Sequence, residues 1–185
     1  MKRKMIWVLA ITLIAAVSIG AQEADERFQF VFGPRVGATY IFVDDWTSYD
    51  NTIQKAFPDN ARTYFPVITQ FGLNIEQRIR LGTTKSHFAF QEVLLVGGID
   101  QNVVIPSLST LIGFRSQAGL EIGIGPNFAM SVKDGNPVLG MSVVIAAGWT
   151  FSFEGVYVPV NIAIVPTPRD GSPRLTIVTG FNFDL

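Results

Sequence analysis

The chain has 185 residues and no cysteine, which excludes disulfides and cysteine-bound metals. Its formal net charge of −1 does not supply the basic surface of a nucleic-acid-binding protein. Hydrophobic residues make up 48% of the chain and charged residues only 16%, whereas a soluble domain carries roughly 25–35% charged residues on its surface. With a mean hydropathy of +0.33, the composition indicates more apolar surface than a soluble domain needs.

The N-terminal segment has the features of a secretory signal peptide. Residues 2–4 are Lys, Arg and Lys, and an apolar run from Met5 to Ile19 follows them and ends in small residues. This run is shorter than the roughly 20 apolar residues of a membrane-spanning helix. We therefore expect a signal peptide over residues 1–21, cleaved after Gly20 or Ala21, then a short tail over 22–27. Cleavage also removes the basic residues at positions 2–4, so acidic residues outnumber basic residues in the mature chain.

The first two strands are predicted by alternation of apolar and polar residues. From Phe28 to Phe42 the even positions are mostly apolar, and the same pattern recurs more clearly from Val67 to Leu81. A period of two is the repeat of a β-strand with two different faces. Each of these segments is therefore expected to be a strand.

The connection from Asp44 to Pro66 lacks a strand pattern, and a loop this long is usually functional or disordered. Ile53, Ala56 and Phe57 fall at helical spacing, and Pro58 should end a helix at or before Phe57. The aromatic residues of this loop either contact a surface partner, fold back on the body of the protein, or are merely tolerated. These candidate contacts are Trp46, Tyr49 and Phe57.

Two further strands are expected at 88–98 and 105–114, where the residues are apolar but alternate poorly. Their register is not fixed by the pattern. Phe88 and Phe90 share a parity with Glu92, and a β-bulge near Gln91 is one way to switch the faces.

The remaining segments alternate clearly and bring the total to eight strands. They are Leu120–Met130, Leu139–Phe153, Val156–Ile164 and Leu175–Leu185. An even number suits a single-chain bacterial barrel, whose first and last strands pair. If both termini are periplasmic, the short connections fall on that side and the longer ones outside. The short ones are 82–85, 115–117 and 154–155; the outer ones are 44–66, 98–106, 133–137 and 166–174.

The polar face carries mainly Gly, Ser, Thr, Asn and Ala with isolated charges, which suits the crowded lumen of an eight-stranded barrel. Aromatic residues gather toward the strand ends, as in the interfacial girdles of membrane barrels. The expected fold is therefore all-β: a single eight-stranded antiparallel up-and-down barrel of transmembrane type over residues 28–185. A soluble barrel is the alternative.

Several charged residues have the parity of the lumen, where an enclosed charge needs a partner or water. We expect a lumen charge network that acts as a structural plug; the alternative is a narrow gated pore. Its candidate members are Arg35, Glu76, Arg78, Arg80, Glu121 and Glu154.

The pattern resembles the small eight-stranded outer membrane protein beta-barrel domain superfamily. The segments that carry it are FGPRVGATY (32–40), GIGPNFAM (123–130) and TIVTGFNFDL (176–185). The resemblance implies a Gram-negative-type outer membrane, contact with its lipid, and recognition of the last strand by the barrel assembly machinery. Family members usually end in an aromatic residue, whereas this chain ends in Asp184 and Leu185, with Phe183 before them.

No arrangement for catalysis is evident. His87 is the only histidine and follows a turn placed on the periplasmic side, which does not support a catalytic, zinc or redox-metal site. We expect no cofactor and a non-enzymatic structural or surface-interaction role, with a surface partner that the sequence does not identify. The alternatives are a soluble periplasmic barrel that binds a hydrophobic ligand, and a narrow pore.

Overall fold

The structure is a computed structural model that describes residues 28–58, 63–133, 135–153, 156–166 and 172–184. The predicted signal peptide and tail and Glu154 lie outside these residues. The strands are β1 (Phe28–Ile41), β2 (Val67–Arg80), β3 (His87–Gly97), β4 (Ile105–Arg115), β5 (Leu120–Lys133), β6 (Asn136–Phe153), β7 (Val156–Val165), β8 (Arg174–Gly180) and β9 (Phe183–Asp184). A helix, α2 (Trp46–Ala56), and a 3₁₀ turn, η2 (Ile99–Gln101), lie in the connections.

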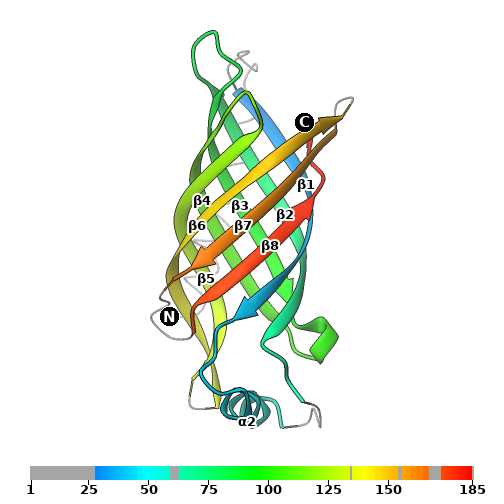
Figure 1. Ribbon diagram of the computed structural model, residues 1–185, viewed down its shortest axis with the longest axis vertical. Coiled ribbons are helices and arrows are strands. Elements are labelled where there is room, and N and C mark those ends of the chain that lie inside the picture. Colours follow the sequence, from blue (N-terminus) through cyan, green and yellow to red (C-terminus); the bar gives the residue numbers. More distant parts are fainter. Residues whose placement is uncertain (1–27, 59–62, 134, 154–155, 167–171, 185) are drawn as a thin grey trace, which may run out of the picture.

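The strands form a closed antiparallel barrel in which each strand pairs with the next (Figure 1). The barrel closes because β1 pairs with β2 on one edge and with β8 and β9 on the other. This confirms the predicted fold, an all-β eight-stranded antiparallel up-and-down barrel. The predicted strands also correspond to the observed ones to within a few residues at each end.

The eighth strand is divided into β8 and β9 by a proline on its neighbour. The pairing of Arg35 with Gly180 and of Val31 with Asp184 keeps one register through both parts. Between them, the Phe181 N–H donates to the Pro34 carbonyl oxygen over 3.4 Å. The reciprocal bond to the Phe181 carbonyl oxygen is missing because Pro34 has no N–H. β8 and β9 are therefore one barrel strand with an interrupted ladder.

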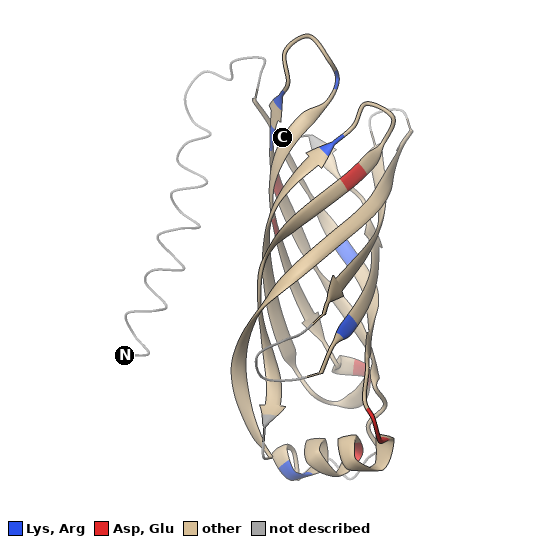
Figure 2. Cartoon of the chain, turned by 60° about the vertical axis from the view of Figure 1, so that its left-hand side comes forward, with Lys and Arg blue, Asp and Glu red and all other residues tan. Residues whose placement is uncertain are grey.

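Alternate residues of each strand face outward and inward, as the sequence pattern predicts. On β6, Ile145 is 50% exposed on the outer face, whereas the next inward residue, Val144, is 4% exposed. Figure 2 shows few charged residues along the barrel wall. The outer surface is dominated by large apolar side chains, with aromatic residues toward the strand ends.

The hypothesis of a bulge near Gln91 is wrong. β3 pairs without interruption through this residue, with Glu76 of β2 on one side and Leu111 of β4 on the other. The alternation therefore continues, and Glu92 lies on the outer face with Phe88 and Phe90. The weak pattern of β3 arises because this carboxylate occupies an outward position among apolar residues.

The two ends of the barrel differ. One end, called here the turn end, carries the short β2–β3, β4–β5 and β6–β7 connections; the other, the α2 end, carries the first loop, with α2 lying across it (Figure 1). The Asp45 side chain caps α2 by accepting hydrogen bonds from the Thr47 and Ser48 N–H groups. The helix ends at Ala56, before Pro58, as predicted. Within the described segments, no helix is both long and apolar enough to cross a membrane.

Candidate functional site

The barrel interior divides into two parts, and we treat both as candidate sites. Toward the turn end, charged and amide side chains fill the lumen and bond to one another. Toward the α2 end, the lumen holds a cavity. We call the first part the charge network and the second the cavity.

Glu76 of β2 lies at the centre of the charge network and is only 1% exposed. Its Oε1 atom accepts hydrogen bonds from Arg78 Nε at 2.8 Å and from Arg115 Nε at 3.0 Å. Arg115 Nη2 also lies 3.3 Å from Glu76 Oε2, and Arg115 Nε lies 3.3 Å from Glu121 Oε1. The buried carboxylates and guanidinium groups thus neutralise one another within the lumen.

Amide and aromatic side chains complete this network. Arg115 Nη2 donates to Gln91 Oε1 at 3.0 Å, and Gln91 Nε2 donates to Asn74 Oδ1 at 2.7 Å. The Arg78 guanidinium lies 5.6 Å from the centre of the Tyr157 ring. Thr150 bonds through its hydroxyl to Glu121. The network therefore links β2, β3, β4, β5, β6 and β7 across the barrel.

Arg35 occupies a separate position, at the seam where the barrel closes. Its Nη1 atom donates to the carbonyl oxygens of Pro34 at 3.0 Å and Phe181 at 3.2 Å, and its Nη2 atom donates to Asn182 Oδ1 at 2.6 Å. The Phe181 carbonyl faces a proline without an N–H. Arg35 thus supplies the hydrogen bond that the ladder lacks at this point.

The predicted lumen residues are placed as follows. Arg35, Glu76, Arg78 and Glu121 are buried inside the barrel, whereas Arg80 has inward parity but is exposed at the turn-end rim. Arg115 was missed because the predicted strand ended at Phe114. Arg115 follows Leu111 and Gly113 at alternate positions of β4, so it faces inward with them. This alternation could have identified it from the sequence.

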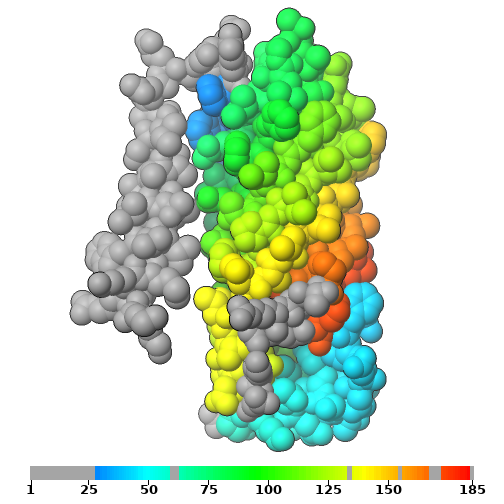
Figure 3. Space-filling view, turned by 90° about the vertical axis from the view of Figure 1, so that its left-hand side faces the viewer, coloured from blue at the N-terminus to red at the C-terminus, as the bar shows by residue number. Residues whose placement is uncertain are grey.

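The cavity has a volume of about 440 Å³. Strand residues form its wall, and residues of the first loop line its outer side. These are Tyr49, Ile53, Phe57 and Tyr64. Figure 3 shows this first loop, in cyan, and the yellow end of the β5–β6 hairpin at the same end of the molecule.

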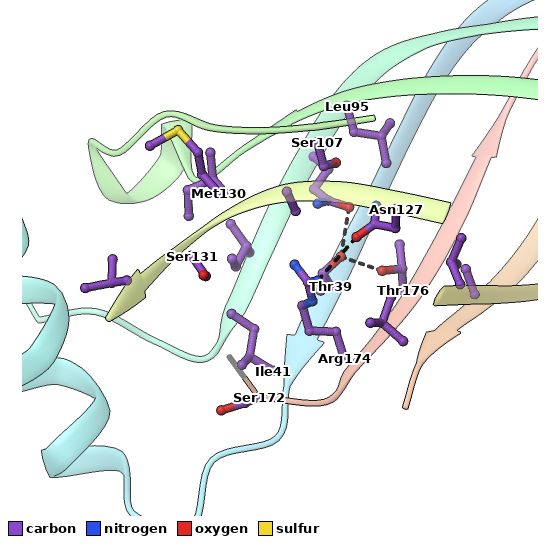
Figure 4. A pocket seen from close by; sticks show the side chains of 18 of the residues that line it. Thr39, Ile41, Leu95, Ser107, Asn127, Met130, Ser131, Ser172, Arg174 and Thr176 are labelled. Atoms are coloured by element: carbon purple, nitrogen blue, oxygen red, sulfur yellow. Dashed lines mark hydrogen bonds between the residues drawn. The ribbon is translucent and has the colours of Figure 1, made fainter. Parts of the chain in front are cut away.

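Polar side chains cluster on one side of the cavity (Figure 4). The Thr39 hydroxyl bonds to Gln70 Oε1 at 2.8 Å and to the Thr176 hydroxyl at 2.7 Å. Arg174 Nη2 donates to Asn127 Oδ1 at 3.3 Å, but Arg174 Nε is buried without a hydrogen-bond partner. A guanidinium with a free donor therefore lies in the wall of a largely apolar cavity.

The three aromatic residues singled out in the first loop take different positions. Trp46 is 47% exposed, packs against the Phe65 ring in a tilted arrangement, and donates from Nε1 to the Tyr64 carbonyl oxygen at 2.8 Å. Tyr49 and Phe57 instead turn toward the barrel mouth and pack against the buried side chains there. Burial, with the nearby Asp50 carboxylate, raises the pKa of Tyr49 to about 12.

His87 is the first residue of β3, at the turn end, and is half-buried. In the described part of the chain, no group of three or more His, Cys, Asp or Glu residues is placed to hold a metal ion.

Comparison with known proteins identifies the fold alone. No family model and no curated protein sequence matches this chain. The crystal structure of Ail, the attachment invasion locus protein of Yersinia pestis, is 12% identical, covers 85% of this chain and 97% of its own, and has a TM-score of 0.52. The chain thus has the architecture of a small eight-stranded outer-membrane barrel.

Two more solved structures have the same coverage of both chains, 85% and 97%. One is Ail of Yersinia pestis in complex with the heparin analogue sucrose octasulfate, with 12% identity and a TM-score of 0.46. The other is Neisserial surface protein A, with 11% identity and a TM-score of 0.37.

Proposed function

We propose that this protein is a non-enzymatic outer-membrane β-barrel that acts as a structural or surface-interaction component of a Gram-negative-type cell envelope. The observation that carries this proposal is the outer face of a closed barrel. Large apolar side chains cover this face on every strand. Such a surface is unfavourable in water but suits contact with lipid. The fold shared with Ail supports the same location.

The charge network is proposed to act as a plug. Arg78, Arg115, Glu76 and Glu121 are buried and in contact, so they leave little room for ions to pass. The protein reconstituted in a planar lipid bilayer should show no steady conductance. A gated pore would instead show discrete openings, and these would contradict the plug.

The α2 end is proposed to face the cell exterior. Its loops are held in one arrangement: Tyr64 N–H donates to Asp50 Oδ1 at 2.7 Å, and Gln101 Nε2 donates to the Val67 carbonyl oxygen at 2.6 Å. Trp46 and Phe65 form an exposed aromatic pair beside them. A rigid, partly apolar surface of this kind suits contact with another molecule.

Cysteine labelling tests location and orientation together, because the chain has no native cysteine. Asn51→Cys places a thiol on the exposed side of α2, and Thr83→Cys places one at the turn end. A membrane-impermeant maleimide should label Asn51→Cys on intact cells, and Thr83→Cys only after the outer membrane is permeabilised. The opposite pattern, or release of the protein by osmotic shock, would contradict the proposal.

A further inference from the structure

The cavity at the α2 end has the character of a ligand site. Its volume of about 440 Å³ lies within the roughly 300–1,000 Å³ of small-molecule pockets. Side chains can just fill the interior of an eight-stranded barrel, so a space of this size depends on small residues at inward positions. The small residues that line it include Ser107, Ser109, Ala129, Ala146 and Ala163.

Most of the wall is apolar. Leu111, Val144 and Val165 form one buried cluster that borders the cavity, and Val93 and Val178 line it as well. On the outer side, Ile53 and Phe57 add apolar surface. These surfaces suit an acyl or other hydrocarbon chain, which gains free energy when it leaves water.

Two cationic side chains border this cavity, Arg35 and Arg174, and only Arg35 uses both terminal nitrogens in hydrogen bonds, to Pro34, Phe181 and Asn182. Arg174 is less fully bonded. Its Nε atom is buried without a hydrogen-bond partner, and its Nη2 atom donates to Asn127 Oδ1 at 3.3 Å. No described carboxylate forms an ion pair with it, whereas Arg78 and Arg115 of the charge network are paired with Glu76. Arg174 is partly buried, and a cation withdrawn from water without a counter-charge is destabilising, so an anion at this position would be stabilising.

We propose that the cavity binds an amphiphile with a single anionic head group. Arg174 holds the head group, a carboxylate or a phosphate, through its Nε donor. The hydrocarbon chain lies along Leu111, Val144 and Val178, and the α2 segment closes over it. This goes beyond the proposed surface role, because a barrel that only presents its outer end does not need a largely apolar cavity with a cation in its wall.

Photo-crosslinking can test this on the folded protein in phosphatidylcholine nanodiscs. The probe is dodecanoic acid with a diazirine at the end of its chain, compared with the matching alkyl phosphate and the matching alcohol. Peptide mass spectrometry then locates the labelled residues. Labels from the acid or the phosphate on inward residues such as Val144 support the proposal, and the stronger of the two probes identifies the head group. Labels only on outward residues such as Val143 would show simple partition into lipid and overturn it.

Two neighbouring alanines provide a matched pair of variants. Ala146 lines the cavity, whereas Ala147, the next residue of β6, faces outward. Ala146→Phe should abolish inward labelling, and Ala147→Phe should leave it unchanged. Equal inward labelling of both variants would overturn the proposal.

Arg174→Gln tests the head group without filling the cavity. It should weaken binding of the acid by about tenfold or more, because a hydrogen bond to a charged group contributes roughly 1.5–3 kcal/mol. It should leave the weak labelling by the alcohol unchanged. If the acid and the alcohol label the parent protein equally, or if Arg174→Gln has no effect, the assignment of Arg174 is wrong. Osmotic release of the protein from cells would contradict the proposed function but would not alter these binding results.

Discussion

Arg115 and Glu76 form an ion pair across the lumen, with Arg115 Nε 3.0 Å from Glu76 Oε1, although their strands β4 and β2 are not neighbours in the sheet. The pair therefore ties together two parts of the wall that share no backbone hydrogen bonds. Because Glu76 also holds Arg78, this one carboxylate compensates two buried guanidinium groups.

Glu76→Gln should destabilise the barrel strongly, because it leaves Arg78 and Arg115 buried without their shared counter-charge. Breaking a buried ion pair from one side costs about 3–5 kcal/mol. Urea unfolding in lipid vesicles, followed by tryptophan fluorescence, measures the change. Arg80→Gln is the control, since Arg80 is exposed at the rim, and its effect should be small. A loss for Glu76→Gln no larger than that of the control would show that water, not the pairing, compensates these charges.

We expect Arg35 to contribute to the stability of the barrel mainly because Pro34 interrupts the hydrogen-bond ladder at the seam between β1 and the last strand. Arg35→Gln removes the donor that reaches the Phe181 carbonyl oxygen and should reduce the free energy of unfolding by about 1–3 kcal/mol. Pro34→Ala restores an N–H opposite Phe181. The double variant should therefore lose less than Arg35→Gln alone, and a double-mutant cycle measures the coupling. Strictly additive effects would show that Arg35 does not substitute for the missing ladder bond.

The sequence predicted the strand order, and it predicted the facing of six strands because a period of two in those strands reports which side meets the lumen. It did not predict which lumen residues meet, because contacts such as Arg115 with Glu76 depend on how non-adjacent strands face one another across the barrel. The hypothesis of a β-bulge near Gln91 was wrong for a different reason. A single charged residue, Glu92, was assumed to be incompatible with the outer face, and the structure places it there.

The cavity was beyond sequence analysis for a different reason. Alternation shows that Ala146 and Ala163 point inward, whereas the pattern did not fix the facing of Ser107. The space between these residues depends on the summed volumes of side chains from several strands. The free Nε donor of Arg174 likewise emerges only when its surroundings are known. Fold and facing are thus local properties of the chain, whereas the candidate sites are properties of the closed barrel.

Ile145→Arg should destabilise the barrel if the outer face meets lipid. Ile145 lies between Ile124 of β5 and Ile164 of β7, and all three side chains are exposed on the outer face. A cation near the bilayer midplane costs about 2–4 kcal/mol, falling to about 0–1 kcal/mol near the interface. Phe153→Arg, at the turn end of the same face, is the control. Equal unfolding free energies for the two variants in lipid vesicles would argue against a bilayer around this face.

Glu92→Leu should stabilise the protein in lipid. Glu92 is an outward carboxylate of β3, paired in register with Ile75 and Thr110. Replacing it with an apolar residue removes the cost of a charge at the lipid face and should raise the free energy of unfolding by about 1 kcal/mol. Leu94→Glu, at the next outward position of β3, should have the opposite effect. Loss of stability in Glu92→Leu would indicate that the carboxylate makes a favourable contact in the membrane.

The docking of α2 against the barrel mouth should depend on whether the Tyr49 hydroxyl is protonated. Burial against the barrel mouth, with Asp50 nearby, raises the pKa of Tyr49 from 10.0 to about 12. The neutral phenol is thus the form that the folded state favours, and its contribution to stability is complete below pH 10 and lost as the pH rises through about 12. The ultraviolet absorbance of tyrosinate should show a late titration that Tyr49→Phe removes. Trp46 fluorescence should report release of α2 over the same range in the parent protein, while Tyr49→Phe, which cannot ionise there, keeps the helix docked. If α2 is released in both proteins at the same pH, another group controls its docking.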